Sequence, residues 1–379
     1  MDFSLTDEQI DIQQAAKEFA TGEFDPDAAL EYDENQQFPS TLWKKACQLG
    51  FIGLHYPEEY GGQELGLSDN VLVIEAFCRQ DSGIGMALAL SDFGSEIILR
   101  NGDEKQKKGV LPSLAQGKGV MTLAFLEGGY SLSPLATTAE KTQGGYVING
   151  SKSYVTLAGL ADPMLVFCQT DPDNPQGQSL FLIHRESEGV DVTSMGGKVG
   201  MRMIPVDRVF FRDAKIPENS RVGKENEGAP QLDDFFDELR IECGAMGVGI
   251  AQGGLDKALD YARKREQFGK AIIHFDAIRN KIADIYMEIE MARLVTYRAA
   301  WSFDKGNRDS RAALLSKLVA SKAAYRATYD ALQIHGGFGY MKEGQIEHFY
   351  RDAKALELFS EPQQGQKDRL ADLITGKKA

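Results

Sequence analysis

Cysteine and histidine are scarce in this sequence. The 379 residues include four cysteines and five histidines, and no two cysteines form a CxxC pair. Scattered thiols in a chain this long fit a reducing compartment better than a disulfide framework. No paired spacing of histidine with cysteine suggests zinc, so we expect no bound metal. The cysteines are Cys47, Cys78, Cys168 and Cys243.

The sequence also lacks an excess of positive charge and any long apolar run. Lys and Arg number 42 against 56 Asp and Glu, which gives a formal net charge of −14. This balance argues against a nucleic-acid partner, which would need clustered positive charge. No run approaches the roughly 20 apolar residues that span a bilayer. The opening "MDFSLTDEQI" is acidic and has no apolar signal core, so we expect a cytoplasmic protein.

Three zones of different texture follow one another along the chain. Residues 1–118 have helical patterns, as in "SLTDEQIDIQQAAKEFA", "TLWKKACQLGFIGL" and "NVLVIEAFCRQ". Residues 119–225 contain short β-branched and aromatic segments separated by turn residues, such as "GGYVINGSKSYVTLA" and "DRVFFRDAKIP", and predict a β domain. Residues 226–379 return to long helical periodicities joined by short loops, which predict an antiparallel bundle.

One acidic residue stands out in the helical zone. The stretch "MALALSDFGSEIILR", residues 86–100, has the pattern of a helix interior except for Asp92, which has no cation within three or four positions. Two readings are open. Asp92 either caps a turn before Gly94 or meets solvent, or it is held inside for chemistry, since burial raises the proton affinity of a carboxylate.

Five short motifs in order extend over nearly the whole chain: "LGFIGLHYPEEYGG", "NGSKSYVT", "RKREQFG", "LQIHGGFGY" and "YRDAK". Together they resemble the acyl-CoA dehydrogenase family. The resemblance implies an α+β fold with an N-terminal helical domain, a middle β-barrel-like domain and a C-terminal four-helix bundle. It also implies FAD in the cleft between the β domain and the bundle, an acyl-CoA thioester on the flavin's re face, a homotetramer that shares its flavin sites, and an electron-transferring flavoprotein as acceptor.

The resemblance assigns FAD contacts to the C-terminal motifs. Arg265 would pair with the pyrophosphate, for which a guanidinium is well suited, and Phe268 would stack on adenine. Gln333 and the loop of Gly336 and Gly337 would contact the flavin of a neighbouring subunit, since glycine lets backbone approach a phosphate closely. The plainer alternatives are that Arg265 solvates a helix end, that Phe268 is a core residue and that the glycine loop is only a turn that ends a helix.

Further roles follow from the resemblance in the middle of the chain. Thr156 would hydrogen-bond the flavin ring, with Tyr154 beside it. Asp237 and Arg240 of "DELR" would hold the CoA arm. The family's Thr-Glu-Pro-x-x-Gly-Ser-Asp loop is replaced by "LEGGYSLSP". Leu126 therefore supplies only a backbone N–H to the flavin, and Ser133 is the other expected contact.

The usual catalytic glutamate is missing. At its place after an aromatic residue stands Ser360, which follows Phe359, and serine is far too weak a base for proton abstraction. A minority of the family carries the glutamate one residue before the CoA-binding arginine, and Leu239 stands there.

Three explanations compete for the missing base. In the first, Glu361 or Glu238 occupies the position of the usual base, which would give ordinary 1,2-dehydrogenation of a saturated acyl-CoA. A shift of one residue on a helix rotates a side chain by about 100°, so this explanation needs a local bulge. Alternatively, the protein binds acyl-CoA or flavin without catalysis. The third explanation, which we prefer, takes Asp92 as the base for a proton on the γ carbon. This would be a 1,4-elimination on an alicyclic enoyl-CoA such as cyclohex-1-ene-1-carbonyl-CoA, with the thioester carbonyl held by a backbone N–H near Ser360.

Overall fold

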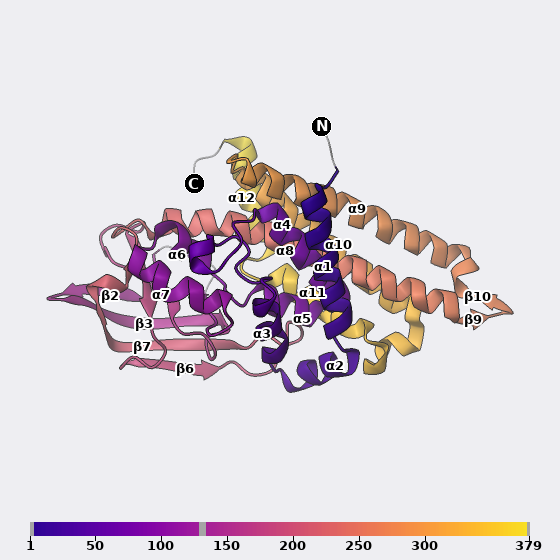
Figure 1. The fold of residues 1–379 in the computed structure, drawn as a ribbon, viewed down its shortest axis with the longest axis horizontal. Helices are drawn as coiled ribbons and strands as arrows, with labels where there is room; N and C mark the ends of the chain where they lie inside the picture. Colours follow the sequence, from indigo (N-terminus) through magenta and orange to yellow (C-terminus); the bar gives the residue numbers. More distant parts are fainter. Residues whose placement is uncertain (1–3, 129–133, 377–379) are drawn as a thin grey trace.

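The computed structural model describes residues 4–128 and 134–376, so the predicted flavin contact Ser133 lies outside the described residues. Figure 1 shows a β-sheet at one side of the molecule, long helices at the other, and the N-terminal helices packed across the middle. In the described part of the chain, no helix has the length and apolar content to span a membrane.

The first zone forms short helices with conventional caps. Helix α1 begins with a capping box in which Thr6 and Gln9 bond each other's backbone, and Asp103 and Gln106 do the same for α7. The predicted helix "TLWKKACQLGFIGL" ends early because Gly50 and Gly53 adopt positive φ angles of 77° and 69°. The helices of this zone are α1 (Asp7–Glu23), α2 (Pro26–Asn35), α3 (Ser40–Gln48), η1 (Glu58–Tyr60), α4 (Leu67–Gln80), α5 (Ser82–Ala89), α6 (Ser95–Asn101) and α7 (Glu104–Ala115).

The middle zone forms one sheet with the order β6-β7-β3-β2-β4-β5-β8, and β1 pairs in parallel with β4. Its centre is the long antiparallel pair of β3 and β7, while β4 is buried along its whole length. This matches the β-branched and aromatic composition of these segments. The strands are β1 (Thr122–Ala124), β2 (Thr138–Thr142), β3 (Gly145–Thr156), β4 (Met164–Gln169), β5 (Gln178–Ile183), β6 (Val190–Ser194), β7 (Val206–Pro217) and β8 (Arg221–Val222), and η2 (Glu218–Ser220) precedes β8.

The last zone is built around helix α8 (Gly228–Lys264), which packs on α4, α9, α10 and α11. Its glycines allow this close packing: a Cβ at Gly247 would lie 2.7 Å from the backbone of Ala320 on α10. The helix has 37 residues, so at 1.5 Å per residue it is about 55 Å long. The other elements are β9 (Glu266–Gln267), β10 (Lys270–Ala271), η3 (Ile272–His274), α9 (Asp276–Asp304), α10 (Ser310–His335), η4 (Gly336–Tyr340), η5 (Lys342–Gly344), α11 (Ile346–Leu358) and α12 (Gln363–Thr375).

Candidate active site

Asp92 lies in a turn between α5 and α6, not inside a helix as its surroundings in the sequence suggest. The helix breaks after Ala89, and Gly94 has a φ of 94°, which favours glycine. The turn is anchored by a backbone hydrogen bond from Met121 to Ser91 at 3.1 Å, next to the sheet. The prediction of helix around Asp92 is therefore wrong.

A tyrosine holds the Asp92 carboxylate. The Tyr56 hydroxyl donates a hydrogen bond of 2.8 Å to Asp92 Oδ2. Burial raises the pKa of Asp92 above its ordinary value. Burial also keeps the pKa of Tyr56 well above its usual range, so the phenol stays a donor. The arrangement gives a carboxylate with increased affinity for a proton and a fixed orientation.

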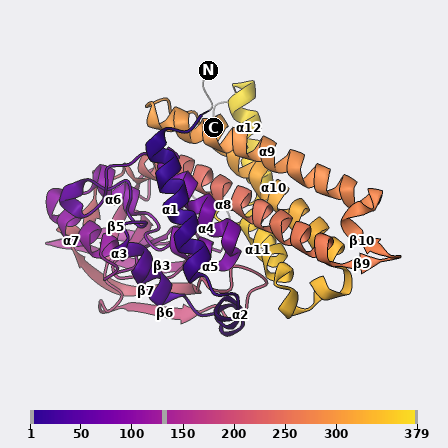
Figure 2. The same ribbon diagram turned by 45° about the vertical axis from the view of Figure 1, so that its right-hand side comes forward.

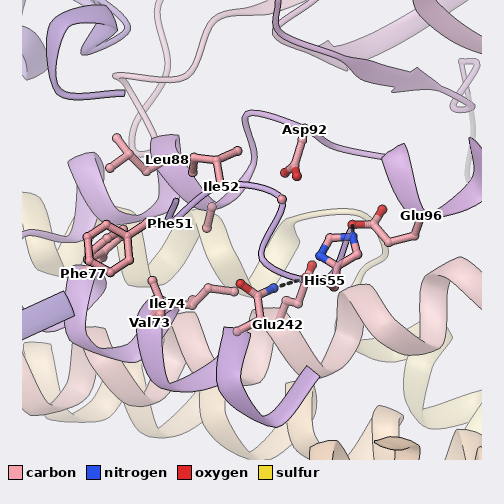
Figure 3. A pocket seen from close by; sticks show the side chains of 13 residues that line it. Phe51, Ile52, His55, Val73, Ile74, Phe77, Leu88, Asp92, Glu96 and Glu242 are labelled. Carbon is pink, nitrogen blue, oxygen red and sulfur yellow. Dashed lines mark hydrogen bonds and ion pairs between the residues drawn. The ribbon is translucent and has the colours of Figure 1, made fainter. Parts of the chain in front are cut away.

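A small cavity adjoins Asp92. Its volume of about 20 Å³ is enough for a single water molecule. Figure 3 shows the Asp92 carboxylate directed into this space, with Ile52 on one side and His55 and Glu96 on the other. The lining residues are Phe51, Ile52, Gly53, His55, Asn70, Val73, Ile74, Phe77, Leu88, Ala89, Asp92, Glu96 and Glu242.

A larger cavity of about 140 Å³ lies between the sheet and the bundle, where Ser360 is found. It brings together Leu126, Arg240 and Ser360, three of the residues predicted to contact flavin or substrate. Phe93, the neighbour of Asp92, packs on Phe359, the neighbour of Ser360, with ring centroids 5.9 Å apart. The lining residues are Phe125, Leu126, Phe236, Arg240, Ser360, Glu361 and Arg369.

The three alternative positions for a base are engaged elsewhere. The Glu361 carboxylate pairs with Arg240 at 3.2 Å, and the Glu238 carboxylate pairs with Arg100 at 2.6 Å. Leu239 is 1% exposed and belongs to the core. Both carboxylates are therefore held by an arginine, and Leu239 has no acidic group.

Arg240, which lines the larger cavity, is held by three groups. Its guanidinium donates to Asp237 at 2.8 Å, pairs with Glu361, and lies over the Phe236 ring at 5.7 Å. The side chain is 4% exposed. A fixed guanidinium in a cavity wall suits an anionic or carbonyl group of a ligand.

A buried lysine that the sequence analysis missed shapes the segment around Ser360. Lys317 Nζ donates to the carbonyls of Phe359 and Glu361 and lies 3.4 Å from Ser360 Oγ. Ser360 itself has a φ of 60°. Burial lowers the pKa of Lys317 to about 8.

Residues predicted to contact the flavin ring lie at the C-terminal end of β3 and directly after β1, where Leu126 lines the larger cavity. Thr156 ends β3, and its carbonyl accepts a hydrogen bond from the Thr122 hydroxyl. The Leu126 carbonyl accepts a bond of 2.9 Å from the Ser153 N–H, which ties the segment after β1 to β3. Tyr154 is 61% exposed and offers its ring to a ligand or to another chain.

The predicted pyrophosphate and adenine contacts lie at the far end of the bundle. Arg265 is the residue that follows α8 and is not on the helix, and Phe268 is 95% exposed at the turn between β9 and β10, so it is not a core residue. Gln333 is exposed nearby, and a Cβ added at Gly336 or Gly337 would meet no atom within 4 Å. An exposed cation, an exposed ring and open glycine backbone fit a dinucleotide such as FAD.

These two sets of flavin residues are far apart in one chain. Phe125, next to Leu126, packs on Phe236 of α8 with ring centroids 5.1 Å apart. Lys264, the last residue of α8, follows Phe236 by 28 positions, and Arg265 comes directly after it; this is about 40 Å along the helix at 1.5 Å per residue. Figure 2 shows the β9–β10 hairpin projecting at the end of the bundle remote from β3 and β7. The structure brings together Leu126, Arg240 and Ser360, but not these with Arg265 and Phe268.

Comparison with known proteins gives a consistent result over the whole chain. The family descriptions "Acyl-CoA dehydrogenase, N-terminal domain", "middle domain" and "C-terminal domain" match residues 6–118, 125–214 and 226–374. "Probable acyl-CoA dehydrogenase FadE25" of Mycobacterium tuberculosis is 34% identical over 96% of this chain and 95% of its own length. "Acryloyl-CoA reductase (NADH)" of Anaerotignum propionicum is 32% identical over 95% and 92%.

Solved structures agree in fold. Butyryl-CoA dehydrogenase from Megasphaera elsdenii superposes with a TM-score of 0.94 at 30% identity, covering 99% of this chain and 100% of that one. A structure described as "PigA with FAD and proline" gives 0.94 at 31% identity over 100% of both chains. A chain from a study of the electron transferring flavoprotein of Acidaminococcus fermentans gives 0.94 at 33% identity over 99% of both chains.

A helical domain, a β domain and a helical bundle in this order, with a cavity at their junction, define a class of three-domain α+β oxidoreductases. The chain belongs to the acyl-CoA dehydrogenase family, and it is an FAD-dependent oxidoreductase that acts on CH–CH bonds of acyl-CoA. The predicted fold class, family and cofactor are confirmed.

Several groups around Asp92 escaped the sequence analysis. His55 and Tyr56 stand inside a motif quoted for the family resemblance, and Glu96 follows Asp92 by four positions, but neither pattern indicated a shared cavity. Glu242 lies 150 positions away on α8. Only the folded chain brings these residues together.

Proposed function

We propose that this protein oxidises an alicyclic enoyl-CoA, of the type of cyclohex-1-ene-1-carbonyl-CoA, by 1,4-elimination with Asp92 as the base. One observation supports this proposal above the others. Asp92 is a half-buried carboxylate of raised pKa that is hydrogen-bonded by a phenol, whereas Glu361 and Glu238 are bound by arginines and Ser360 and Leu239 have no acidic group.

The chemistry requires a base remote from the thioester carbonyl. When a double bond is already present at the α carbon, the acidic hydrogen is on the γ carbon, because conjugation carries the negative charge to the thioester. Asp92 takes that proton, while a backbone N–H near Ser360 binds the carbonyl oxygen. When bound, FAD supplies the acceptor for the hydride that leaves another ring carbon.

The site residues are proposed in the roles that the geometry allows. Leu126, Tyr154 and Thr156 contact the flavin ring, with Ser133 beyond the described residues. Asp237 and Arg240 hold the CoA arm. The lack of an acid at Ser360 and Leu239 suppresses 1,2-elimination.

We further propose a homotetramer in which Arg265, Phe268, Gln333, Gly336 and Gly337 complete the flavin site of a neighbouring subunit. The separation of about 40 Å along α8 supports this. An electron-transferring flavoprotein is the proposed acceptor, and a cytoplasmic location stays a prediction from the sequence.

The direct test is a screen of thioesters for loss of the oxidised-flavin absorbance under anaerobic conditions. Wild-type protein is expected to respond to an alicyclic enoyl-CoA, and Asp92→Asn should show no response while it retains FAD. A response of Asp92→Asn equal to wild type contradicts the assignment of the base.

A second candidate function is ordinary 1,2-dehydrogenation with Glu361, because Glu361 lines the same cavity as Ser360. It predicts that a straight-chain saturated acyl-CoA reduces the flavin and that the Glu361→Gln variant is not reduced.

Our proposal predicts instead that the Ser360→Glu variant oxidises a saturated ring thioester, whereas the wild-type protein does not. A protein that responds to no thioester would be a non-catalytic homologue.

A further inference from the structure

The cavity beside Asp92 contains more ionisable groups than proton abstraction alone requires. Glu96 of α6, Glu242 of α8 and His55 of the segment before η1 line it together with Asp92 (Figure 3). Among the described lining residues none is a lysine or an arginine. The cavity therefore gathers three carboxylates and one imidazole without a fixed positive charge.

Two polar atoms in this cluster are buried without a hydrogen-bond partner in the described chain: Glu96 Oε2 and His55 Nε2. His55 Nε2 lies 3.4 Å from Glu96 Oε1, and the Glu96 side chain is 6% exposed. Leaving such a group unsatisfied destabilises the folded protein. A water in the cavity would have these atoms and the Asp92 carboxylate as partners, which is the number of contacts that buried waters usually make.

The electrostatics of the carboxyl groups of Asp92, Glu96 and Glu242 favour protonation of some of them. Burial, reinforced by Glu238 and Asp92, raises the pKa of Glu96 well above its ordinary value, and burial with Glu96 and Glu238 does the same for Glu242. Asn70 donates to Glu242 at 2.9 Å, which does not neutralise it. The charged and titratable groups that face the cluster are Cys47, His55, Tyr56, Asp92, Glu96, Arg100, Glu238 and Glu242, and Arg100 is bonded to Glu238.

We propose that Glu96 and His55 form a relay that carries the abstracted proton from Asp92 to solvent through the cavity. This inference depends on the proposed function. In the transfer Glu96, which holds a proton at rest, passes that proton to His55 and takes up the proton of the Asp92 carboxylic acid, so each bond to hydrogen that breaks is matched by one that forms, the net charge of the cluster is unchanged and no electrons move. His55 is the exit, because its side chain is 15% exposed against 6% for Glu96.

Hydrogen isotope washout tests the relay. Wild-type protein is incubated without an electron acceptor with an alicyclic enoyl-CoA deuterated at the γ carbon, and loss of deuterium to water is followed by mass spectrometry. In Glu96→Gln we expect washout to slow about tenfold or more, while the rate of flavin reduction changes less than about threefold because Asp92 is intact. Glu96→Asp should restore part of the washout.

A matched control and a second readout separate a relay from a structural role. Glu347→Gln removes a largely buried carboxylate that pairs with Arg351 and does not line the cavity, and it should leave washout unchanged. The infrared difference between wild type and Glu96→Gln at neutral pH should contain the C=O stretch of a protonated carboxyl. A difference spectrum with only carboxylate bands overturns the proposal.

Failure of the relay and failure of the proposed function give different experimental results. If flavin reduction occurs but Glu96→Gln washes out deuterium at the wild-type rate, the relay is wrong and the proposed function stands. If no alicyclic enoyl-CoA reduces the wild-type flavin, both are wrong.

Discussion

At the scale of single residues, the hydrogen bond from Tyr56 favours the ionised form of Asp92. This bond of 2.8 Å stabilises the ionised carboxylate and so opposes the effect of burial on the pKa. A hydrogen bond to a charged group contributes about 1.5–3 kcal/mol, which corresponds to about 1–2 pH units.

In Tyr56→Phe the pKa of Asp92 should therefore rise by about 1–2 units. Because the base must be ionised, the midpoint of the pH dependence of flavin reduction should move to higher pH by the same amount. Stopped-flow measurements across pH give this midpoint. A midpoint equal to that of the wild type would show that the phenol does not control the base.

Lys317 should impose a separate limit at alkaline pH. Its ammonium group bonds the carbonyls of Phe359 and Glu361, and its pKa is lowered to about 8 by burial. Above that pH the neutral amine holds the segment around Ser360 less firmly, so the Kd of a non-reactive acyl-CoA thioester should rise. In Lys317→Gln this rise should be absent. Titration of the flavin spectrum measures the Kd, and a rise of the same size in the variant would assign it to another group.

At the scale of elements, the glycines of α8 control how closely its neighbours approach. A Cβ at Gly253 would lie 2.6 Å from the Phe349 ring and against the Arg79 carbonyl, whereas one at Gly254 would lie 3.2 Å from a Thr328 methyl group. Overpacking of this kind costs about 1–3 kcal/mol.

Gly253→Ala should therefore lower the free energy of unfolding by about 1–3 kcal/mol, and Gly254→Ala should change it much less. Thermal unfolding of the two FAD-loaded variants, followed side by side, makes the comparison. Equal Tm values would mean that α8 and α11 separate easily at this point.

Prediction from sequence succeeded for long or strongly patterned elements. The order of helical, β and helical zones and the strands β3 and β7 follow from periodicity, which is a local property of the chain. It failed where one glycine decides the backbone, as at Gly50 and Gly94, because an apolar run gives no sign that a helix stops within it.

The candidate site was predictable only in part for a related reason. Asp92 could be singled out because its neighbours in the sequence are apolar. Its partners Tyr56, Glu96 and Glu242 come from three separate segments, and their proximity depends on how the segment before η1 packs with α6 and α8. No pattern in the sequence reports such packing.

At the scale of the whole molecule, helix α9 presents an apolar stripe to its surroundings. The stripe consists of Met287, Met291, Leu294 and Trp301, which are 54–60% exposed and follow a helical spacing. Exposed apolar stripes of this kind are typical of interfaces between proteins. The stripe supports the proposed assembly of several copies of the chain.

Leu294→Lys should weaken that assembly, because burying an ammonium group in an apolar interface is costly. Sedimentation velocity should show smaller species with a reduced FAD content. Leu49→Lys, the same change at a leucine that is 60% exposed outside the stripe, is the control and should sediment like the wild type. Identical sedimentation of both variants would exclude α9 from the interface.

The length of α8 has a consequence for mixtures of inactive variants. If the base and the flavin-ring contacts belong to one subunit while Arg265 and Phe268 belong to the next, then two inactive variants can repair each other. Subunits with Asp92→Asn and subunits with Arg265→Ala, unfolded and reassembled together, should form hybrid sites in which both halves are intact, and activity should return. Variants whose lesions both fall in one half, such as Asp92→Asn with Thr156→Val, should give no such rescue.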